Sequence, residues 1–133
     1  MPPEEEPAGT IGAERISDAE HAVMEALWLR SPQSAAEVCD QVAAARGWSM
    51  PTVKTLLARL VAKGVLGTTA EGRRFLYTPL IERSAYLGTE SRRLVDRLFG
   101  GRAAPLFAHL AASEQLSDED IAEISRLLQE LRK

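Results

Sequence analysis

The chain has 133 residues, of which 45% are hydrophobic and 26% are charged. This length and composition are those of a folded globular protein with one or two small domains. They exclude a membrane-spanning protein, because no apolar run reaches the roughly 20 residues that a span requires. The single Cys39 excludes an internal disulfide, and we expect it to pack within a helix. The acidic amino terminus is unlike a signal peptide, so we expect a cytoplasmic protein.

Charge is distributed unevenly along the chain. The net charge is −3, yet residues 46–102 contain eleven Lys or Arg and only four Asp or Glu, which leaves −10 on the remainder. A basic segment within an acidic chain concentrates positive potential where it lies. The middle of the sequence therefore predicts a partner with negative charge, such as a nucleic acid.

The first part of the chain predicts a leader followed by two helices. Residues 1–14 are rich in Pro, Glu, Ala and Gly, and we expect them to be disordered. Capping boxes at Ser17-Asp-Ala-Glu20 and Ser34-Ala-Ala-Glu37 predict the two helix starts. The residues expected to face inward are Val23, Met24, Leu27 and Trp28 in the first helix, and Ala35, Val38, Val42 and Ala45 in the second. Arg46-Gly47-Trp48 then predicts a turn, with Gly47 in the left-handed conformation and Trp48 anchored in the core.

Residues 49–63 predict a third helix with two contrasting faces. Ser49 is placed to cap it, and Pro51 suits the first turn. Apolar residues recur at helical spacing on one side, namely Val53, Leu56, Leu57, Leu60 and Val61. The other side offers hydroxyls and cations with no carboxylate among them, from Thr52, Lys54, Thr55, Arg59 and Lys63. Two helices, a three-residue turn and such a helix predict a helix-turn-helix that enters the major groove. An ordinary amphipathic surface helix is the alternative.

After Gly64 the pattern changes to that of two short strands. Residues 65–69 and 73–78 contain β-branched and aromatic residues, and Glu71-Gly72 between them suits a tight turn. Pro79 is expected to end the second strand. A hairpin in this place predicts a winged helix, with a DNA-binding domain over residues 15–80. Arg73 and Arg74 would then lie beside DNA phosphates, or they are merely a solvated pair.

Residues 81–133 predict a helical module that needs a partner. Helices are expected over 82–99, over 105–112 and from the cap Ser117 to the end. Their one-sided apolar stripes are too small to close a core, which predicts a two-fold dimer. Tyr86 and Val95 share the apolar side of the first of these helices with several predicted dimer contacts. The predicted dimerisation residues are Leu87, Leu94, Leu98, Phe99, Leu106, Phe107, Leu110, Ile121, Ile124, Leu127, Leu128 and Leu131. The sequence thus predicts a mainly α protein, a winged helix-turn-helix domain with a two-stranded wing followed by a three-helix dimerisation module.

Several segments resemble the penicillinase-repressor family, which includes methicillin-resistance and copper-responsive repressors. They are Ile16–Trp28, Trp48–Gly64 and Gly72–Pro79, joined by Leu98–Gly101 and Leu116–Ile121. The resemblance implies a homodimeric winged-helix repressor, linked to the antibiotic response, that occupies palindromic operators overlapping promoters. It places Thr52, Lys54, Thr55 and Arg59 in the groove. From the charge pattern we expect Arg46, Lys63, Arg73 and Arg74 on phosphates, and Ser49 beside them at the helix start.

The sequence departs from the family pattern in two places. Copper-responsive members have paired Cys-x-Cys motifs near the carboxyl end, and these are absent, so no metal or other cofactor is expected. In the β-lactam branch a partner protease system cuts an Asn-Phe bond in the short helix of the dimer module. His109-Leu110 occupies that position here. Cleavage under the control of a membrane sensor-protease and a purely structural helix are the two alternatives.

Other function classes find less support in the residues. His21 and His109 are the only histidines, and neither belongs to a metal or nucleophile motif, so an enzyme is not expected. The alternatives to a repressor are a winged-helix adaptor for protein contacts and a regulator that responds to a small ligand.

Overall fold

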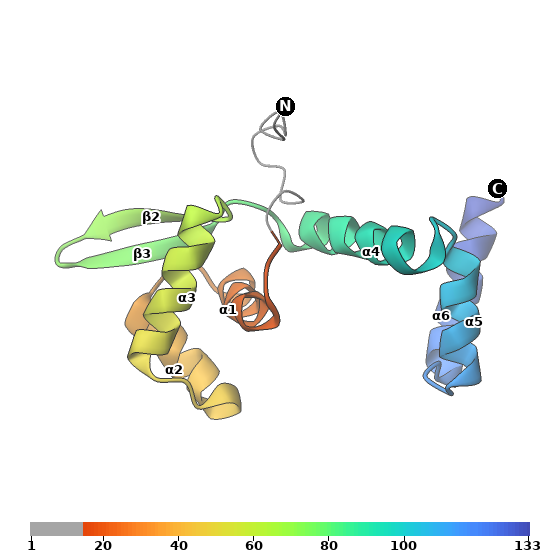
Figure 1. Ribbon diagram of the computed structural model, residues 1–133, viewed down its shortest axis with the longest axis horizontal. Helices are drawn as coiled ribbons and strands as arrows, with labels where there is room; N and C mark the ends of the chain where they lie inside the picture. The colour runs from red at the N-terminus through yellow and green to blue at the C-terminus, as the bar shows by residue number, and fades with distance from the viewer. Residues whose placement is uncertain (1–14) are drawn as a thin grey trace. The chain divides into compact units, whose positions relative to one another are not determined.

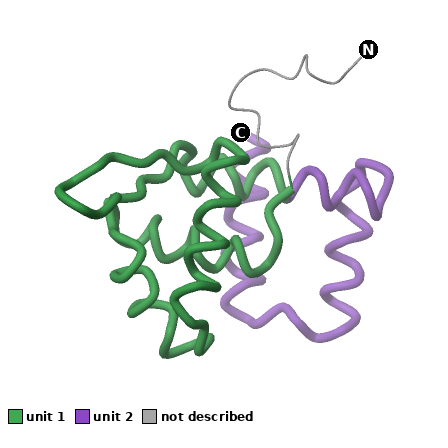
Figure 2. Tube along the Cα trace, turned by 60° about the vertical axis from the view of Figure 1, so that its left-hand side comes forward, with its two compact units in different colours: residues 1–90 green, residues 91–133 purple. Residues whose placement is uncertain are grey.

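The computed structural model describes residues 15–133, so the predicted leader lies outside the described residues. Within this range the chain forms two compact units that meet between Glu90 and Ser91 (Figure 2). We call them the winged-helix unit and the carboxyl-terminal unit. Their elements, labelled in Figure 1, are α1 (Asp18–Leu29), β1 (Gln33–Ser34), α2 (Ala35–Arg46), α3 (Met50–Ala62), β2 (Leu66–Glu71), β3 (Arg74–Pro79), α4 (Arg83–Phe99), α5 (Ala103–Ala112) and α6 (Asp118–Leu131).

Local sequence signals set where the helices begin. α1, α2 and α6 each start with a complete capping box, in which a serine accepts a backbone N–H and the acid three residues later accepts the serine N–H. The pairs are Ser17 with Glu20, Ser34 with Glu37 and Ser117 with Asp120. These caps satisfy amide groups that lack a partner within the helix, and the predicted helix starts are confirmed.

The core of the winged-helix unit lies between α1, α2 and α3. The predicted stripe of α3 is buried at Val53, Leu56, Leu57 and Leu60. It meets Val23, Met24 and Leu27 from α1, and Val38 and Val42 from α2. The expectation that Ala45 faces inward was wrong, because the last turn of α2 extends past the core and Ala45 is exposed.

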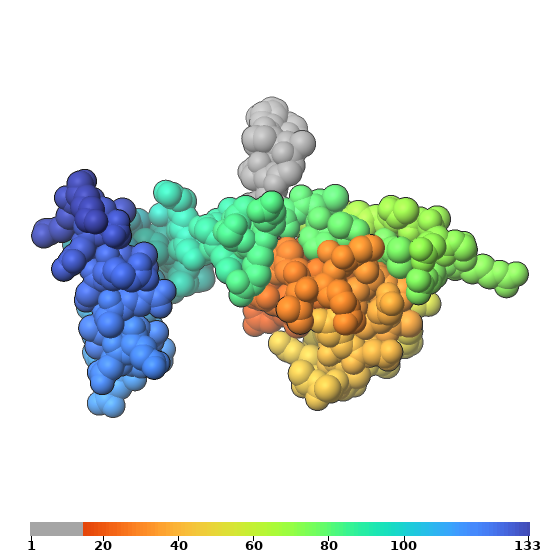
Figure 3. Space-filling view, turned by 180° about the vertical axis from the view of Figure 1, so that it is seen from behind, coloured from red at the N-terminus to blue at the C-terminus, as the bar shows by residue number. Residues whose placement is uncertain are grey.

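The wing belongs to a three-stranded antiparallel sheet with strand order β1-β3-β2. The hairpin of β2 and β3 is longer than predicted, and its turn lies at Gly72-Arg73, where Gly72 has a φ of +64°. Figure 3 shows the hairpin tip projecting from the surface of this unit. The sequence did not predict β1, whose two residues, Gln33 and Ser34, pair with Tyr77 and Leu76 of β3.

The first half of α4 packs against the winged-helix core. Tyr86 is 5% exposed, and its ring lies 5.6 Å from that of Trp28, measured between centroids. The indole Nε1 of Trp28 donates to the carbonyl oxygen of Ile81 at 2.9 Å. Tyr86 and Leu87 therefore pack on the core of the winged helix, and the expectation that they lie on the apolar side of the second module was wrong.

The carboxyl-terminal unit, residues 91–133, has no buried side chain. Its large apolar side chains with the greatest exposure are Leu98, Phe107, Ile121, Leu127, Leu128 and Leu131. The predicted helices are confirmed, with α6 carrying its apolar residues on one side. Among residues 15–133, no helix combines the length and apolar character needed to cross a bilayer.

Candidate nucleic-acid interface

α3 presents a polar, cationic surface opposite its buried stripe. Ser49 caps the helix by accepting the backbone N–H of Thr52 through its Oγ. Thr52, Lys54, Thr55 and Arg59 are all exposed, and we call these four residues the α3 face. Neither Lys54 nor Arg59 forms an ion pair within the described part of the chain. The buried stripe fixes the helix, so the α3 face is held rigidly. Its two cations are free for a ligand, whereas the Thr52 hydroxyl shares a hydrogen bond of 3.2 Å with the hydroxyl of Ser49.

Lys63 does not share this exposure. Its ammonium Nζ lies 2.6 Å from Oε1 of Glu20 and donates to the carbonyl oxygen of Arg15 at 2.7 Å. The Glu20 side chain is only 2% exposed, against 21% for Lys63. The expectation that Lys63 is free on the outer side of the helix was therefore wrong. The ion pair between Lys63 and Glu20 links the end of α3 to the start of α1.

Glu20 is a residue whose role the sequence did not reveal. Its Oε1 also accepts the backbone N–H of Ser17 at 2.9 Å. Burial raises the pKa of this carboxyl, but the bonds from Lys63 and Ser17 outweigh burial and hold the pKa below its ordinary value of 4.5. The capping box identified Glu20 as a local cap, whereas its partner Lys63 lies 43 residues away.

The turn before α3 places another cation at the surface. Gly47 ends α2 with a φ of +68°, as predicted, and Trp48 packs partly against the core. The guanidinium carbon of Arg46 lies 5.2 Å from the centre of the Trp48 ring, which is a cation–π contact.

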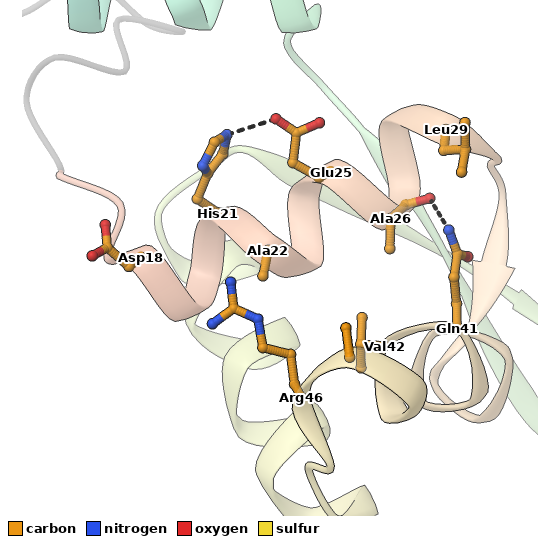
Figure 4. A pocket seen from close by; sticks show the side chains of 10 residues that line it. Asp18, His21, Ala22, Glu25, Ala26, Leu29, Gln41, Val42 and Arg46 are labelled. Carbon is orange, nitrogen blue, oxygen red and sulfur yellow. Dashed lines mark hydrogen bonds and ion pairs between the residues drawn. The ribbon is translucent and has the colours of Figure 1, made fainter. Parts of the chain in front are cut away.

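A groove of about 660 Å³ runs between α1 and α2 beside Arg46. Figure 4 shows Asp18, His21 and Glu25 on the α1 side and Arg46 on the α2 side. His21 and Glu25 form an ion pair if the imidazole is protonated, with Nε2 2.9 Å from Oε2. The groove therefore carries charges of both signs, unlike the α3 face.

The wing arginines differ in how strongly they are held. Arg73 lies in the exposed turn, and no ion pair within residues 15–133 engages it. Arg74 donates to Oε1 of Glu71 through Nε at 3.0 Å and Nη2 at 2.7 Å, which raises its pKa. The pKa of Glu37 is lowered, chiefly by the backbone N–H of Ser34 and further by nearby Arg74. Of the two arginines, Arg73 is the one free to meet an anion.

Comparisons with known proteins agree with this arrangement. The family model described as penicillinase repressor matches residues 16–130. The chain is 36% identical over 116 residues to the penicillinase repressor of Bacillus licheniformis, covering 87% of this chain and 91% of that protein. It is 29% identical over 113 residues to the methicillin resistance regulatory protein MecI of Mammaliicoccus sciuri, covering 85% and 92%. The solved DNA-binding domain of the repressor BlaI is 43% identical with a TM-score of 0.50, and the match covers 54% of this chain and 88% of that one.

The chain belongs to the penicillinase-repressor family. The match extends through α4, α5 and α6, so the family pattern includes the carboxyl-terminal unit as well as the winged helix. The resemblance drawn from the sequence is thereby confirmed.

In this penicillinase-repressor family member, the predicted cleavage position lies inside α5. His109 is exposed and Leu110 is half-buried. The carbonyl oxygen of His109 accepts the backbone N–H of Ser113 at 3.0 Å and its hydroxyl at 2.9 Å. The His109-Leu110 bond is therefore part of a hydrogen-bonded helical turn.

The predicted dimerisation residues fall into two groups. Leu87 lies against the winged-helix core. The others lie in the carboxyl-terminal unit, where Leu94, Phe99, Leu106, Leu110 and Ile124 are half-buried and the remainder are exposed. No group of three or more His, Cys, Asp or Glu in the described range is placed to hold a metal ion.

Proposed function

We propose that two copies of this chain form a repressor that occupies a palindromic operator, with one α3 helix in each half-site. The chain is a DNA-binding transcriptional repressor of the penicillinase-repressor family. The dimer, the symmetry of the operator and the residues that contact DNA make up the proposal. A dimer with two-fold symmetry requires half-sites about one helical turn apart, roughly 10 base pairs.

The observation that carries the proposal is the α3 face. Its hydroxyls and cations are exposed on a helix whose other side is buried in a rigid core. An α-helix fits the major groove, where Arg reads guanine and Thr contacts the thymine methyl group. Arg59 and the two threonines are therefore assigned to bases. Repression follows from steric occlusion, because a dimer on the promoter keeps RNA polymerase away.

Cations around the α3 face supply the affinity that does not depend on sequence. Arg46, Lys54 and Arg73 are exposed and form no ion pair within residues 15–133, and Arg74 is exposed but paired with the exposed Glu71. Lys63 is paired with the buried Glu20 and is left out. With three or four phosphate contacts per subunit, a dimer neutralises about 6 to 8 phosphates, and the log-log salt slope is about −5 to −7. Binding should therefore weaken steeply as salt rises.

The dimer is assigned to the carboxyl-terminal unit. In a single copy, the leucines of α6 and Phe107 of α5 expose apolar surface to water, which is unfavourable in free energy. A second copy offers the same surface and satisfies two-fold symmetry. The proposal also assigns the protein to the cytoplasm, where it meets DNA.

Release from the operator is assigned to proteolysis at His109-Leu110 by a system that includes a membrane sensor-protease. Cutting there separates α6 from the rest of the chain and removes three of the four exposed leucines of the carboxyl-terminal unit, Leu127, Leu128 and Leu131. Because the bond lies within a helical turn, the protease must first unwind part of α5.

The rival functions are distinguished by the same surfaces. An adaptor for protein contacts requires apolar side chains on the exposed side of α3, which instead carries the α3 face and Ala58. The groove between α1 and α2 favours the second alternative, a regulator that binds a small ligand. Absence of catalytic activity is part of the proposal, as the family consists of repressors.

Selection of duplexes from a random-sequence library by the purified full chain tests this function. We expect enrichment of a two-fold symmetric motif whose half-sites are about 10 base pairs apart, centre to centre. Enrichment of single, unpaired half-sites would contradict the dimer. No enrichment of any sequence would contradict the assignment of the α3 face to base reading.

A further inference from the structure

A cavity of about 430 Å³ lies between the wing and the starts of two helices. Its lining includes the first residues of α2, the start of α3 with Lys54, and Arg73, Phe75 and Tyr77 of the hairpin. We call this cavity the wing notch. It adjoins the α3 face through Lys54, which belongs to both.

The strand that the sequence did not reveal fixes the width of the wing notch. Ser34 is both the cap of α2 and a residue of β1, where it pairs with Leu76 of β3. Gln33 pairs with Tyr77, and its buried amide donates to the carbonyl oxygens of Ala26 and Arg30 at 3.1 and 2.6 Å. The start of α2 and the wing are therefore parts of one hydrogen-bonded sheet. A ligand meets a preformed site.

The electrostatics of the wing notch favour an anion. Lys54 and Arg73 are exposed, and neither is engaged in an ion pair within residues 15–133. The nearby carboxylates have partners of their own. Glu71 accepts a hydrogen bond from Arg74, and Glu37 accepts the backbone N–H of Ser34. The partial positive charges at the starts of α2 and α3 add to those of the two cations.

The wing notch also contains an apolar side chain that is largely exposed. Phe75 is 57% exposed, although phenylalanine normally lies inside. Side chains alternate along a strand, so Phe75 and Tyr77 point to the same side of the hairpin. The notch therefore places free cations beside an exposed aromatic ring. The sugar-phosphate backbone of DNA combines an anion with an adjacent, largely apolar sugar in the same way.

We propose that the wing notch holds one deoxyribose of the DNA backbone together with the phosphates on either side of it, with Lys54 on one phosphate, Arg73 on the other and Phe75 packed against the sugar. This inference rests on the proposed function, which already counts Lys54 among the phosphate cations, and deepens it. Lys54, which the resemblance places in the groove, is given a particular phosphate, and Phe75 becomes a positioning residue that sets how deeply α3 enters. Phosphate contacts fix the register of a protein on DNA without reading sequence.

The test measures binding of the full chain to a random-sequence duplex over a range of salt concentrations. Lys54→Gln and Arg73→Gln should each reduce the magnitude of the log-log salt slope, by about 1 for every phosphate that the variant no longer neutralises. Phe75→Ser should weaken binding about 5-fold to 10-fold and leave the slope unchanged, because it removes apolar surface and no charge. Phe75→Leu, which preserves an apolar side chain, should weaken binding less.

Two matched controls isolate the wing notch. Arg97→Gln removes an exposed cation from α4, and Leu29→Ser removes an apolar side chain that is 80% exposed at the end of α1. Neither should change the slope, and neither should change the affinity by more than about twofold. Thermal unfolding of each variant shows whether the fold is intact.

The outcomes separate the wing notch from the function on which it rests. If the wild-type chain binds duplex and Lys54→Gln and Arg73→Gln keep its salt slope, the wing notch is wrong and the repressor assignment stands. If Phe75→Ser folds and binds like the wild type, the sugar contact is wrong. If the wild-type chain does not bind duplex at low salt, the proposed function fails together with the notch.

Discussion

The two units of this chain are built with the same local devices and differ in what they bury. α1, α2 and α6 all begin with a serine and an acid three residues later, and all carry an apolar stripe. In the winged-helix unit the stripes of α1, α2 and α3 meet one another, and Leu27, Leu57 and Leu60 are completely buried. In the carboxyl-terminal unit Leu127 and Leu128 remain about half exposed. Forming helices therefore does not by itself produce a buried core, and only the winged-helix unit does both within one chain.

The largest effect is expected where the second unit needs a partner. Leu127→Asp places a charge in the exposed stripe of α6 and should convert the dimer to monomers. Operator affinity should then fall by about 100-fold or more, because two linked half-sites no longer share a high effective concentration. Sedimentation velocity and operator titration measure both effects.

The matched control is Gln129→Glu, which adds the same charge to an exposed polar position of α6. It should leave the dimer intact. A dimer that survives Leu127→Asp would place the interface elsewhere.

A core substitution should destabilise the winged-helix unit far more than a matched substitution destabilises the carboxyl-terminal unit. Leu57→Ala removes a completely buried side chain and should lower the free energy of unfolding by about 2–5 kcal/mol. Leu128→Ala, measured at concentrations where the dimer has dissociated, should change it by under about 0.5 kcal/mol. Urea denaturation at fixed protein concentration measures both. Equal losses would mean that the carboxyl-terminal unit has a closed core of its own.

A smaller effect is expected from the ion pair between Glu20 and Lys63. Glu20→Gln should cost about 1–3 kcal/mol at pH 7, because it replaces a buried, hydrogen-bonded carboxylate. The pKa of folded Glu20 lies below its ordinary value of 4.5, so its contribution is complete above that pH. It is lost as the pH falls through the folded pKa. The stability gap between wild type and variant should therefore narrow as the pH falls below 4.5.

An exposed pair in the second unit provides the control for this prediction. Glu130 and Lys133 lie 3.5 Å apart with most of their side-chain surface in water, so Glu130→Gln should have no measurable effect. If the difference in unfolding free energy between wild type and Glu20→Gln did not change with pH, the charge of the Glu20 carboxylate would not be the source of the stability.

Patterns confined to a few residues were the ones that the sequence made predictable. The caps at Ser17, Ser34 and Ser117, the stripe of α3 and the turn at Gly47 depend on neighbours within one or two helical turns, and all were confirmed. The exposure of Thr52, Thr55 and Arg59 followed from the same periodicity.

Features that depend on distant partners escaped the sequence. Gln33 and Ser34 are too short a segment for a strand pattern, and β1 exists only because β3 lies beside them. The ion pair between Lys63 and Glu20 joins residues 43 positions apart, and helical periodicity does not predict contacts at that separation. The apolar stripe of α4 does not show which unit Tyr86 packs against. Its ring contacts with His21 and Trp28 place it on the winged-helix unit.

The most direct measurement of the central claim compares wild type and Arg59→Ala on the selected operator and on a scrambled duplex. If the α3 face reads bases, Arg59→Ala should weaken operator binding by about 1–3 kcal/mol per subunit and leave binding to the scrambled duplex nearly unchanged. Arg97→Ala, a control at an exposed position on α4, should preserve the discrimination between the two duplexes. Operator affinity and sequence preference that are both unchanged in Arg59→Ala would contradict the assignment of α3 as the reading helix.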